Sequence, residues 1–208
     1  MIEKTITLDL NGKYKPFNHF FEATGYANTD FTYTPPVKRL YDHLQSYNNH
    51  PRYMRLHNIM TSHGKGYHYK FTIGSDYGNL PYEDVWDDIV VKRAKDGSFE
   101  YDWTVVDTVY DIILGHEMKP IVEMMFIPTV ITHPEDRYIP CNYREYYEVV
   151  KAFVTHWTER YGAEEVKTWY FEITNEPDNC DIFVNHSEYF NALYDYFVAG
   201  VTDVNSEY

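Results

Sequence analysis

Short apolar runs alternate along the 208-residue chain with longer segments in which apolar residues recur every three or four positions. The short runs predict β-strands, and the longer segments predict amphipathic helices. The predicted strands span Phe17–Tyr26, Tyr53–Met60, Pro120–Ile127 and Trp169–Thr174. Each strand is followed by a loop and then by a helix, an order that is typical of a parallel sheet with right-handed crossovers.

The four helices begin at proline or polar residues and end near glycine or at the last apolar position. They run from Pro35 to Tyr47, from Asp102 to Gly115, from Asn142 to Gly162 and from Ser187 to Val201. In the third helix, Asn142 with Glu145 resembles a capping box, and Gly162 is a typical stop signal. Ser187 is expected to cap the fourth helix.

Four strand–helix units suit either half of a barrel or a small open doubly wound sheet. An open sheet of that kind predicts a glycine-rich phosphate turn after the first strand, and Phe21-Glu22-Ala23-Thr24-Gly25-Tyr26 is not one. We therefore expect an α/β fold, a (β/α)8 TIM barrel of which this chain supplies about the first four βα units. Residues 1–208 are expected to form a single domain, truncated against the roughly 250 residues of a full barrel.

Two stretches interrupt the alternation. Residues 61–88 form a long loop after the second strand, and loops at that end of barrel strands build active sites. This loop is a candidate rim for a substrate, and a disordered insertion is the alternative. Residues 89–103 predict a hairpin around Lys95-Asp96-Gly97, because an Asp-Gly pair suits a tight turn.

Composition excludes several classes of function. The formal net charge is −14, and a surface of this sign repels phosphate backbones, so no nucleic-acid partner is expected. No stretch approaches membrane-spanning length, and the N-terminus lacks the apolar segment of a signal peptide. We expect no membrane association and a cytoplasmic protein, with export as the alternative. Cys141 and Cys180 are expected to be ordinary thiols rather than a disulfide.

The chemistry concentrates in the segment from Trp169 to Asp178, where an apolar strand runs directly into Asn175-Glu176-Pro177. A carboxylate at the C-terminal end of a barrel strand lies where catalytic groups belong in that fold. Glycosidic cleavage needs one protonated carboxyl as acid and a second, ionised carboxyl about 5–5.5 Å away as nucleophile. The like charge of the second group helps the first to keep its proton.

This segment resembles the signature of glycoside hydrolase family 39, which contains β-xylosidases and α-L-iduronidases. The signature reads Trp-x-Phe-Glu-x-Trp-Asn-Glu-Pro-Asp/Asn, and the chain departs from it only at Thr174, where the family usually has Trp. Residues 53–57 resemble the family's second strand, and residues 101–103 and 118–128 resemble its second helix and third strand. The resemblance covers residues 15–205.

The resemblance implies a retaining, exo-acting, β-xylosidase-like hydrolase with no cofactor and no metal. It makes Glu176 the general acid/base and Asn175 the partner of the sugar 2-hydroxyl. His57 would face a sugar hydroxyl, and Phe126 would wall the pocket. The substrate would be a xyloside or xylo-oligosaccharide. The family's nucleophile is a Glu at the end of the seventh strand, and no residue of this chain matches it.

Other conspicuous polar residues are assigned structural roles. Strand alternation places Tyr53, Arg55 and His57 on one face, and Glu172, Thr174 and Glu176 on one face of the fourth strand. Arg55 is expected to pair with Glu172 inside the barrel, with Glu123 as a further candidate, and a direct catalytic role is the alternative for the three.

The histidines lack the spacing of a zinc site, whether His63 is taken with His68 or His57 with His19. His19 and Glu22 are open candidates for the pocket, and Cys180 is interpreted as incidental.

Three interpretations of the short chain stay open. It is a fragment of a longer enzyme, or it pairs with a second chain, or two copies complete one barrel with Glu123 approaching the partner's acid. The alternatives to a β-xylosidase are another Asn-Glu-Pro barrel glycosidase with a different sugar specificity and a non-catalytic carbohydrate-binding remnant.

Overall fold

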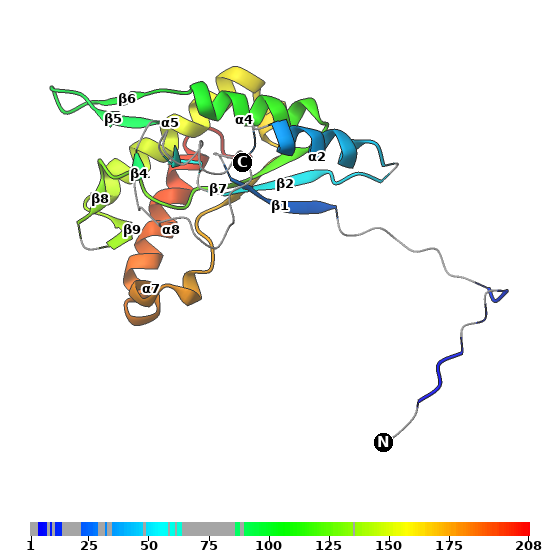
Figure 1. Ribbon diagram of the computed structural model, residues 1–208. Coiled ribbons are helices and arrows are strands. Elements are labelled where there is room, and N and C mark those ends of the chain that lie inside the picture. The colour runs from blue at the N-terminus through cyan, green and yellow to red at the C-terminus, as the bar shows by residue number, and fades with distance from the viewer. Residues whose placement is uncertain are drawn as a thin grey trace.

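The structure is a computed structural model, and it describes residues 4–7, 9, 11–13, 22–28, 32, 35–47, 49–57, 59–60, 62–63, 86–87, 90–134 and 136–208. For residues 26–28, 62–63, 86–87 and 137 it describes the backbone alone. Figure 1 shows the arrangement of helices and strands.

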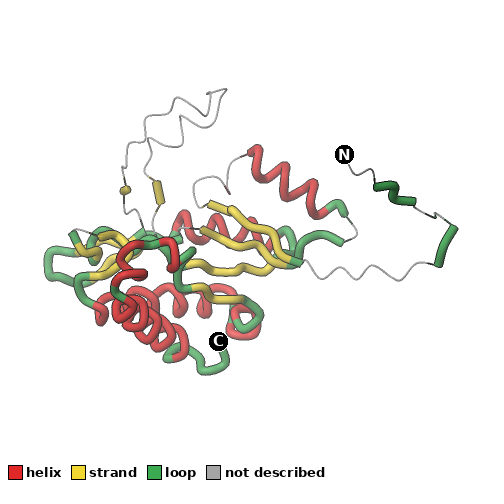
Figure 2. Tube along the Cα trace, turned by 90° about the horizontal axis from the view of Figure 1, so that it is seen from below, coloured by secondary structure: helices red, strands yellow, loops and turns green. Residues whose placement is uncertain are grey.

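The described residues form a parallel sheet whose strands follow one another in chain order, which confirms the predicted parallel α/β arrangement. The strands are β1 (Ala23–Asn28), β2 (Tyr53–His57), β7 (Lys119–Glu123) and β10 (Tyr170–Glu172), in the spatial order β1-β2-β7-β10. Figure 2 shows these strands running side by side. Within the described part of the chain, β1 and β10 are therefore the outer strands.

Strands β2, β7 and β10 are shorter than the apolar runs that predicted them. After β7 the run continues through Met124, Met125 and Ile127, which are 1%, 7% and 4% exposed although they lie in a loop. Phe126 in the same loop has a φ of 47°, which leaves extended geometry. The apolar run is therefore explained by burial rather than by strand structure, and periodicity alone does not separate the two.

Helices occupy the four predicted places, with short helical segments added between them. The helices are α2 (Pro35–Gln45), α4 (Thr104–Gly115), α5 (Tyr143–Tyr161), α6 (Ala163–Val166), α7 (Asp181–Asn185) and α8 (Ser187–Thr202), and a 3₁₀ turn, η1, spans Pro177–Asn179. None of the helices in the described ranges is both long and apolar enough to cross a bilayer.

The predicted helix ends are correct in part. Asn142 caps α5 by accepting a hydrogen bond from Arg144 N at 2.9 Å, and Gly162 ends the helix with a φ of 88°. Glu145 does not complete a capping box, because its carboxylate binds Arg93 at 2.9 and 3.0 Å. The prediction that Ser187 caps α8 is wrong: Ser187 is the first helical residue, and no side chain caps that end.

Among the described residues, three antiparallel strand pairs lie outside the main sheet. The pair β5 (Val91–Arg93) and β6 (Phe99–Tyr101) is the predicted hairpin, and Gly97 turns it with a φ of 88°. The pair β8 (Thr132–His133) and β9 (Asp136–Pro140) was not predicted. The third pair, β3 (Ser62–His63) and β4 (Trp86–Asp87), belongs to the long predicted loop, whose remainder lies outside the described residues.

The core lies between the sheet and the helices. On β2, Met54 and Leu56 are buried at 2% and 0% exposure, whereas Tyr53, Arg55 and His57 on the other face are half-buried. Figure 1 shows α2 and α4 on the same side of β1, β2 and β7. The strands therefore have an apolar helix-covered face and a polar inner face.

Helix α5 carries the largest share of this core. Its buried residues are Tyr146, Tyr147, Val149, Val150, Phe153, Val154 and Trp157. The Trp157 ring stacks on Tyr110 of α4 at 5.0 Å and meets the edge of Trp169 at 6.0 Å. Aromatic contacts of this kind join α4, α5 and the start of β10.

Helices α5 and α8 approach each other closely at Gly200. A Cβ atom added there would lie 2.8 Å from Val150 Cγ1 and 3.1 Å from the Tyr147 carbonyl oxygen. Backbone cannot give way as a flexible side chain can, so only glycine fits at this crossing.

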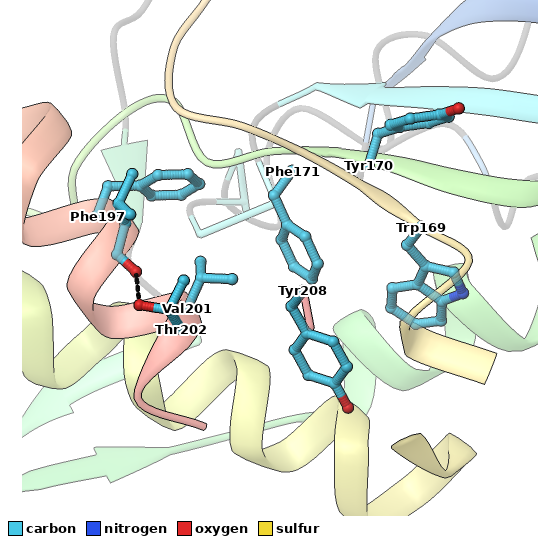
Figure 3. Close-up of a pocket in the computed structure, with 8 residues that line it drawn as sticks. Trp169, Tyr170, Phe171, Phe197, Val201, Thr202 and Tyr208 are labelled. Carbon is cyan, nitrogen blue, oxygen red and sulfur yellow. Dashed lines mark hydrogen bonds between the residues drawn. The ribbon is translucent and has the colours of Figure 1, made fainter. Parts of the chain in front are cut away.

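A cavity of about 230 Å³ lies between β10 and α8, lined by residues of the strand and of the last turns of the helix (Figure 3). Tyr170, Phe197 and Tyr208 are among the residues that line it. Glu176 is not, so this hollow is distinct from the predicted site.

Gly200→Ala is expected to lower the free energy of unfolding by about 1–3 kcal/mol, because the added methyl overpacks the helix crossing. The matched control is Gly115→Ala at the end of α4, where a Cβ meets nothing within 4 Å. That control should be neutral or stabilising by up to about 1 kcal/mol, since alanine favours the helix. Urea unfolding measures the free energy of unfolding of both variants. Equal effects would contradict the close approach of α5 and α8 at Gly200.

Candidate active site

Polar side chains gather where β2, β7 and β10 end. Glu123 and Glu172 are the last residues of their strands and are paired in register, and His57 is the last residue of β2. Because parallel strands bring their carboxyl ends to one edge of the sheet, these groups share that edge. The candidate site is built on this edge and on the loops that leave it.

Arg55 links the sheet to the Asn-Glu-Pro loop. Its guanidinium donates to both oxygens of Glu172, at 2.6 and 2.5 Å, and to Asn175 Oδ1 at 2.9 Å. The Arg55 and Glu172 side chains are 26% and 31% exposed. The expected Arg55–Glu172 pairing is confirmed, and the contact with Asn175 shows that this pair also orients the amide next to Glu176.

Glu176 lies four residues beyond the end of β10, and its backbone has φ 45° and ψ 57°. Its side chain is exposed, and Oε2 accepts a hydrogen bond of 3.4 Å from Asn179 Nδ2. The Glu176 carbonyl accepts from Asn179 N at 2.9 Å and from Cys180 Sγ at 3.6 Å. A left-handed conformation is unfavourable for a residue with a Cβ, and such strain gathers at functional sites.

The left-handed conformation is shared by a second predicted site residue. Among the described residues other than glycine, only Glu117, Phe126 and Glu176 have a positive φ. Phe126 follows β7 and Glu176 follows β10, so the strain recurs in the two loops that leave this edge of the sheet.

His57 and Phe126 lie together. The His57 Nδ1 atom is hydrogen-bonded to Glu123 Oε2, and the imidazole meets the Phe126 ring edge-on at 6.2 Å. Glu123 is fully buried, whereas the His57 side chain is 18% exposed. Glu123 was expected to join Arg55 and Glu172, and instead its carboxylate binds His57.

A row of aromatic rings extends from this pair. Phe126 lies 5.9 Å from Tyr138 of β9, and Tyr138 lies 6.2 Å from Phe183 of α7. Tyr138 was missed at the sequence level because the β8–β9 hairpin was not predicted. The position of Tyr138 in the sequence does not indicate a place in the site, since only the fold brings β9 next to the loop after β7.

Alternation correctly predicts the shared face of the β2 side chains, but it fails for the residues after Glu172. Strand β10 ends there, so alternation does not continue to Thr174 and Glu176. Thr174 is buried at 7% exposure, whereas Glu176 is exposed.

Glu22 does not reach this edge, because β1 begins after it and its carboxylate binds Arg52 at 3.1 Å. The predictions for His19 and for the pair of His63 and His68 concern side chains that the structure does not describe. Cys141 and Cys180 form no disulfide with each other, as expected, and Cys180 is buried. In the part of the chain that the structure describes, no three His, Cys, Asp or Glu side chains come together as metal ligands would.

The three glutamates at this edge differ in what they can do. Glu172 is held by Arg55, and Glu123 is buried against His57. Glu176 is the exposed one, so it can exchange a proton with a bound molecule.

The chain matches a known protein family over more than half of its length. The family model described as glycosyl hydrolases family 39 matches residues 80–208, which include β7, β10 and Asn175-Glu176. The chain belongs to glycosyl hydrolases family 39.

Two β-xylosidases are similar in sequence. That of Caldicellulosiruptor saccharolyticus is 33% identical over 125 residues, which are 55% of this chain and 25% of that protein. That of Geobacillus stearothermophilus is 31% identical over 133 residues, covering 57% of this chain and 26% of that protein. The chain therefore spans about a quarter of the length of the curated relatives it matches.

A solved structure is similar over most of the chain. The crystal structure of the family 39 enzyme from Xanthomonas axonopodis pv. citri superposes with a TM-score of 0.69 and 25% identity. The match covers 92% of this chain and 35% of that enzyme.

The strain at Glu176 can be tested by two substitutions. Glu176→Gly is expected to be more stable than Glu176→Ala by about 1 kcal/mol, because glycine adopts the left-handed conformation without the penalty of a Cβ. The control pair is Asp178→Gly and Asp178→Ala, at a neighbouring position without positive φ, where alanine should be the more stable. Thermal and urea unfolding compare the four variants, and the same order at both positions would contradict the strain.

Glu172→Gln is expected to lower the free energy of unfolding by about 1–2 kcal/mol, since Arg55 loses its charged partner. Glu145→Gln is the matched control, because Arg93 and Glu145 form a two-bonded pair of similar exposure, 35% and 30%, away from the site. Only Glu172→Gln should shift the side-chain amide NMR signal of Asn175. A stable Glu172→Gln protein in which the Asn175 signal does not shift would contradict the orienting role of this pair.

Proposed function

We propose that this chain is the acid/base half of a retaining glycoside hydrolase of the exo-acting β-xylosidase type. The observation that supports this most is the placement of Asn175 and Glu176: an exposed carboxylate beside an amide that Arg55 holds at 2.9 Å. The family model that matches the chain covers residues 80–208, which include both residues.

In this mechanism Glu176 donates a proton to the glycosidic oxygen as the leaving group departs, and later takes a proton from water. Asn175 donates from its Nδ2 to the sugar 2-hydroxyl, because its Oδ1 already accepts from Arg55. His57 faces a sugar hydroxyl, and Phe126 forms an apolar wall. The nucleophile, a second carboxylate about 5–5.5 Å from the first, is supplied from outside these 208 residues.

The proposed fold is the first half of a (β/α)8 barrel. The chain-order parallel sheet with two outer strands supports this, because closing a barrel requires further strands beside β1 and β10. These strands come from the rest of a longer enzyme, from a second chain or from a second copy.

A second candidate is a carbohydrate-binding protein without turnover. It is favoured by the state of the other two glutamates of the site, since Glu172 is bound by Arg55 and Glu123 is buried. Neither is placed as an attacking carboxylate, so binding without hydrolysis is a coherent alternative for the isolated chain.

The test is hydrolysis of an aryl β-D-xyloside by the purified chain, beside Glu176→Ala, together with a xylobiose titration. We expect xylobiose binding without turnover. Asn175→Ala should weaken binding by about tenfold, the effect of losing one hydrogen bond to a buried polar group. Asn185→Ala in α7 is the matched control and should leave the affinity for xylobiose unchanged.

Turnover that disappears in Glu176→Ala would show that a second carboxylate is recruited by association. It would contradict the proposal that the nucleophile is supplied from outside these 208 residues. A folded chain that does not bind xylobiose, or that binds it equally well without Asn175, would contradict the proposed sugar site.

A further inference from the structure

Two buried polar atoms of complementary kind have no hydrogen-bond partner among the described residues. Glu123 Oε1 and the Tyr146 hydroxyl are among the buried side-chain atoms that make no hydrogen bond within the described residues. Both side chains are fully buried. An unsatisfied buried group costs about 1–3 kcal/mol, so each atom needs a partner.

The fold brings these two groups to the same end of the core. Glu123 ends β7, and Tyr146 lies in the first turn of α5, the helix that crosses over from β7 to β10. A crossover helix starts at the carboxyl end of the strand before it, which places Tyr146 at the edge where Glu123 lies.

The chemistry of the pair also fits. Burial raises the pKa of Tyr146, and the negative charge of Glu123 raises it further. The phenol therefore keeps its proton and is a donor, whereas an ionised carboxylate oxygen is only an acceptor.

We propose that Tyr146 and Glu123 are positioning residues for His57. Tyr146 O–H is linked to Glu123 Oε1 through one water, and Glu123 Oε2 accepts the Nδ1 proton of His57. The carboxylate thus fixes one tautomer of the imidazole, with the proton on Nδ1. The sugar-facing role, which rests on the function proposed above, then falls to Nε2 as a hydrogen-bond acceptor.

The test reads the tautomer directly, without sugar or turnover. The ¹⁵N chemical shifts of both imidazole nitrogens are measured in the labelled 208-residue chain at a pH where His57 is neutral, and His57→Gln assigns the signal. We expect the Nδ1–H tautomer to dominate. Glu123→Gln should change the ratio of tautomers by about fivefold, and Tyr146→Phe by about twofold in the same direction.

Tyr147→Phe is the matched control. Tyr147 is the next residue of α5, but its hydroxyl donates to Asp203 Oδ2 at 2.6 Å and accepts from Lys151, so its loss should leave His57 unchanged. Circular dichroism establishes that each variant is folded, and Tyr146→Phe removes one oxygen only, so it can be tested if Glu123→Gln fails to fold.

An Nδ1-unprotonated His57 in the unmodified chain would overturn the proposal. Equal shifts of the His57 ¹⁵N signals in Tyr146→Phe and Tyr147→Phe would also overturn it. The absence of a shift in both variants would do the same. In a xylobiose titration, Tyr146→Phe should raise the Kd by about two- to tenfold, and Tyr147→Phe should not. Absence of xylobiose binding by the unmodified chain overturns the proposed function alone, because the tautomer result still decides this proposal.

Discussion

The ion pair between Arg55 and Glu172 joins two strands that are not neighbours, and the geometry of the site depends on it. Arg55 belongs to β2 and Glu172 to β10, with β7 between them. Strands two places apart in a flat sheet are about 9–10 Å apart, a span that a long guanidinium side chain crosses more easily when the sheet curves toward its polar face. The pair therefore bridges β2 and β10 across β7, and through Asn175 it ties both strands to the loop that carries Glu176.

The same edge shows two ways of holding a polar side chain. Arg55, Glu172 and Asn175 form a half-exposed network in which each partner is charged or amide-like. His57 and Glu123 form a second pair, with the carboxylate fully buried behind the imidazole. The first arrangement tolerates water, whereas the second depends on burial, so the two halves of the site respond differently to changes in packing.

The sheet and helices were predictable because each obeys its own periodicity, and the motif at residues 175–177 was predictable because it follows a strand. Arg55 and Glu172 were paired correctly from alternation. Glu123, a further candidate partner of Arg55, binds His57 instead, since alternation gives the face of a side chain but not its neighbour across the strands. Tyr138 could not be found, because β9 begins with two charged residues and ends at a proline, and its partner β8 has only two residues, so neither leaves an apolar run. The left-handed turns at Phe126 and Glu176 also had no signal, since neither residue is glycine or asparagine.

The distribution of tryptophan has a consequence for spectroscopy. Trp157 and Trp169 are 0% and 5% exposed and pack with Tyr110 in the core, and Trp103 stacks on His156 at 4.2 Å. These three of the chain's four tryptophans pack against α5 or lie in it, and the side chain of Trp86 lies outside the described part of the chain. Intrinsic fluorescence from these rings reports the melting of the α4–α5 core, and a sugar that occupies the strand ends would leave their emission unchanged.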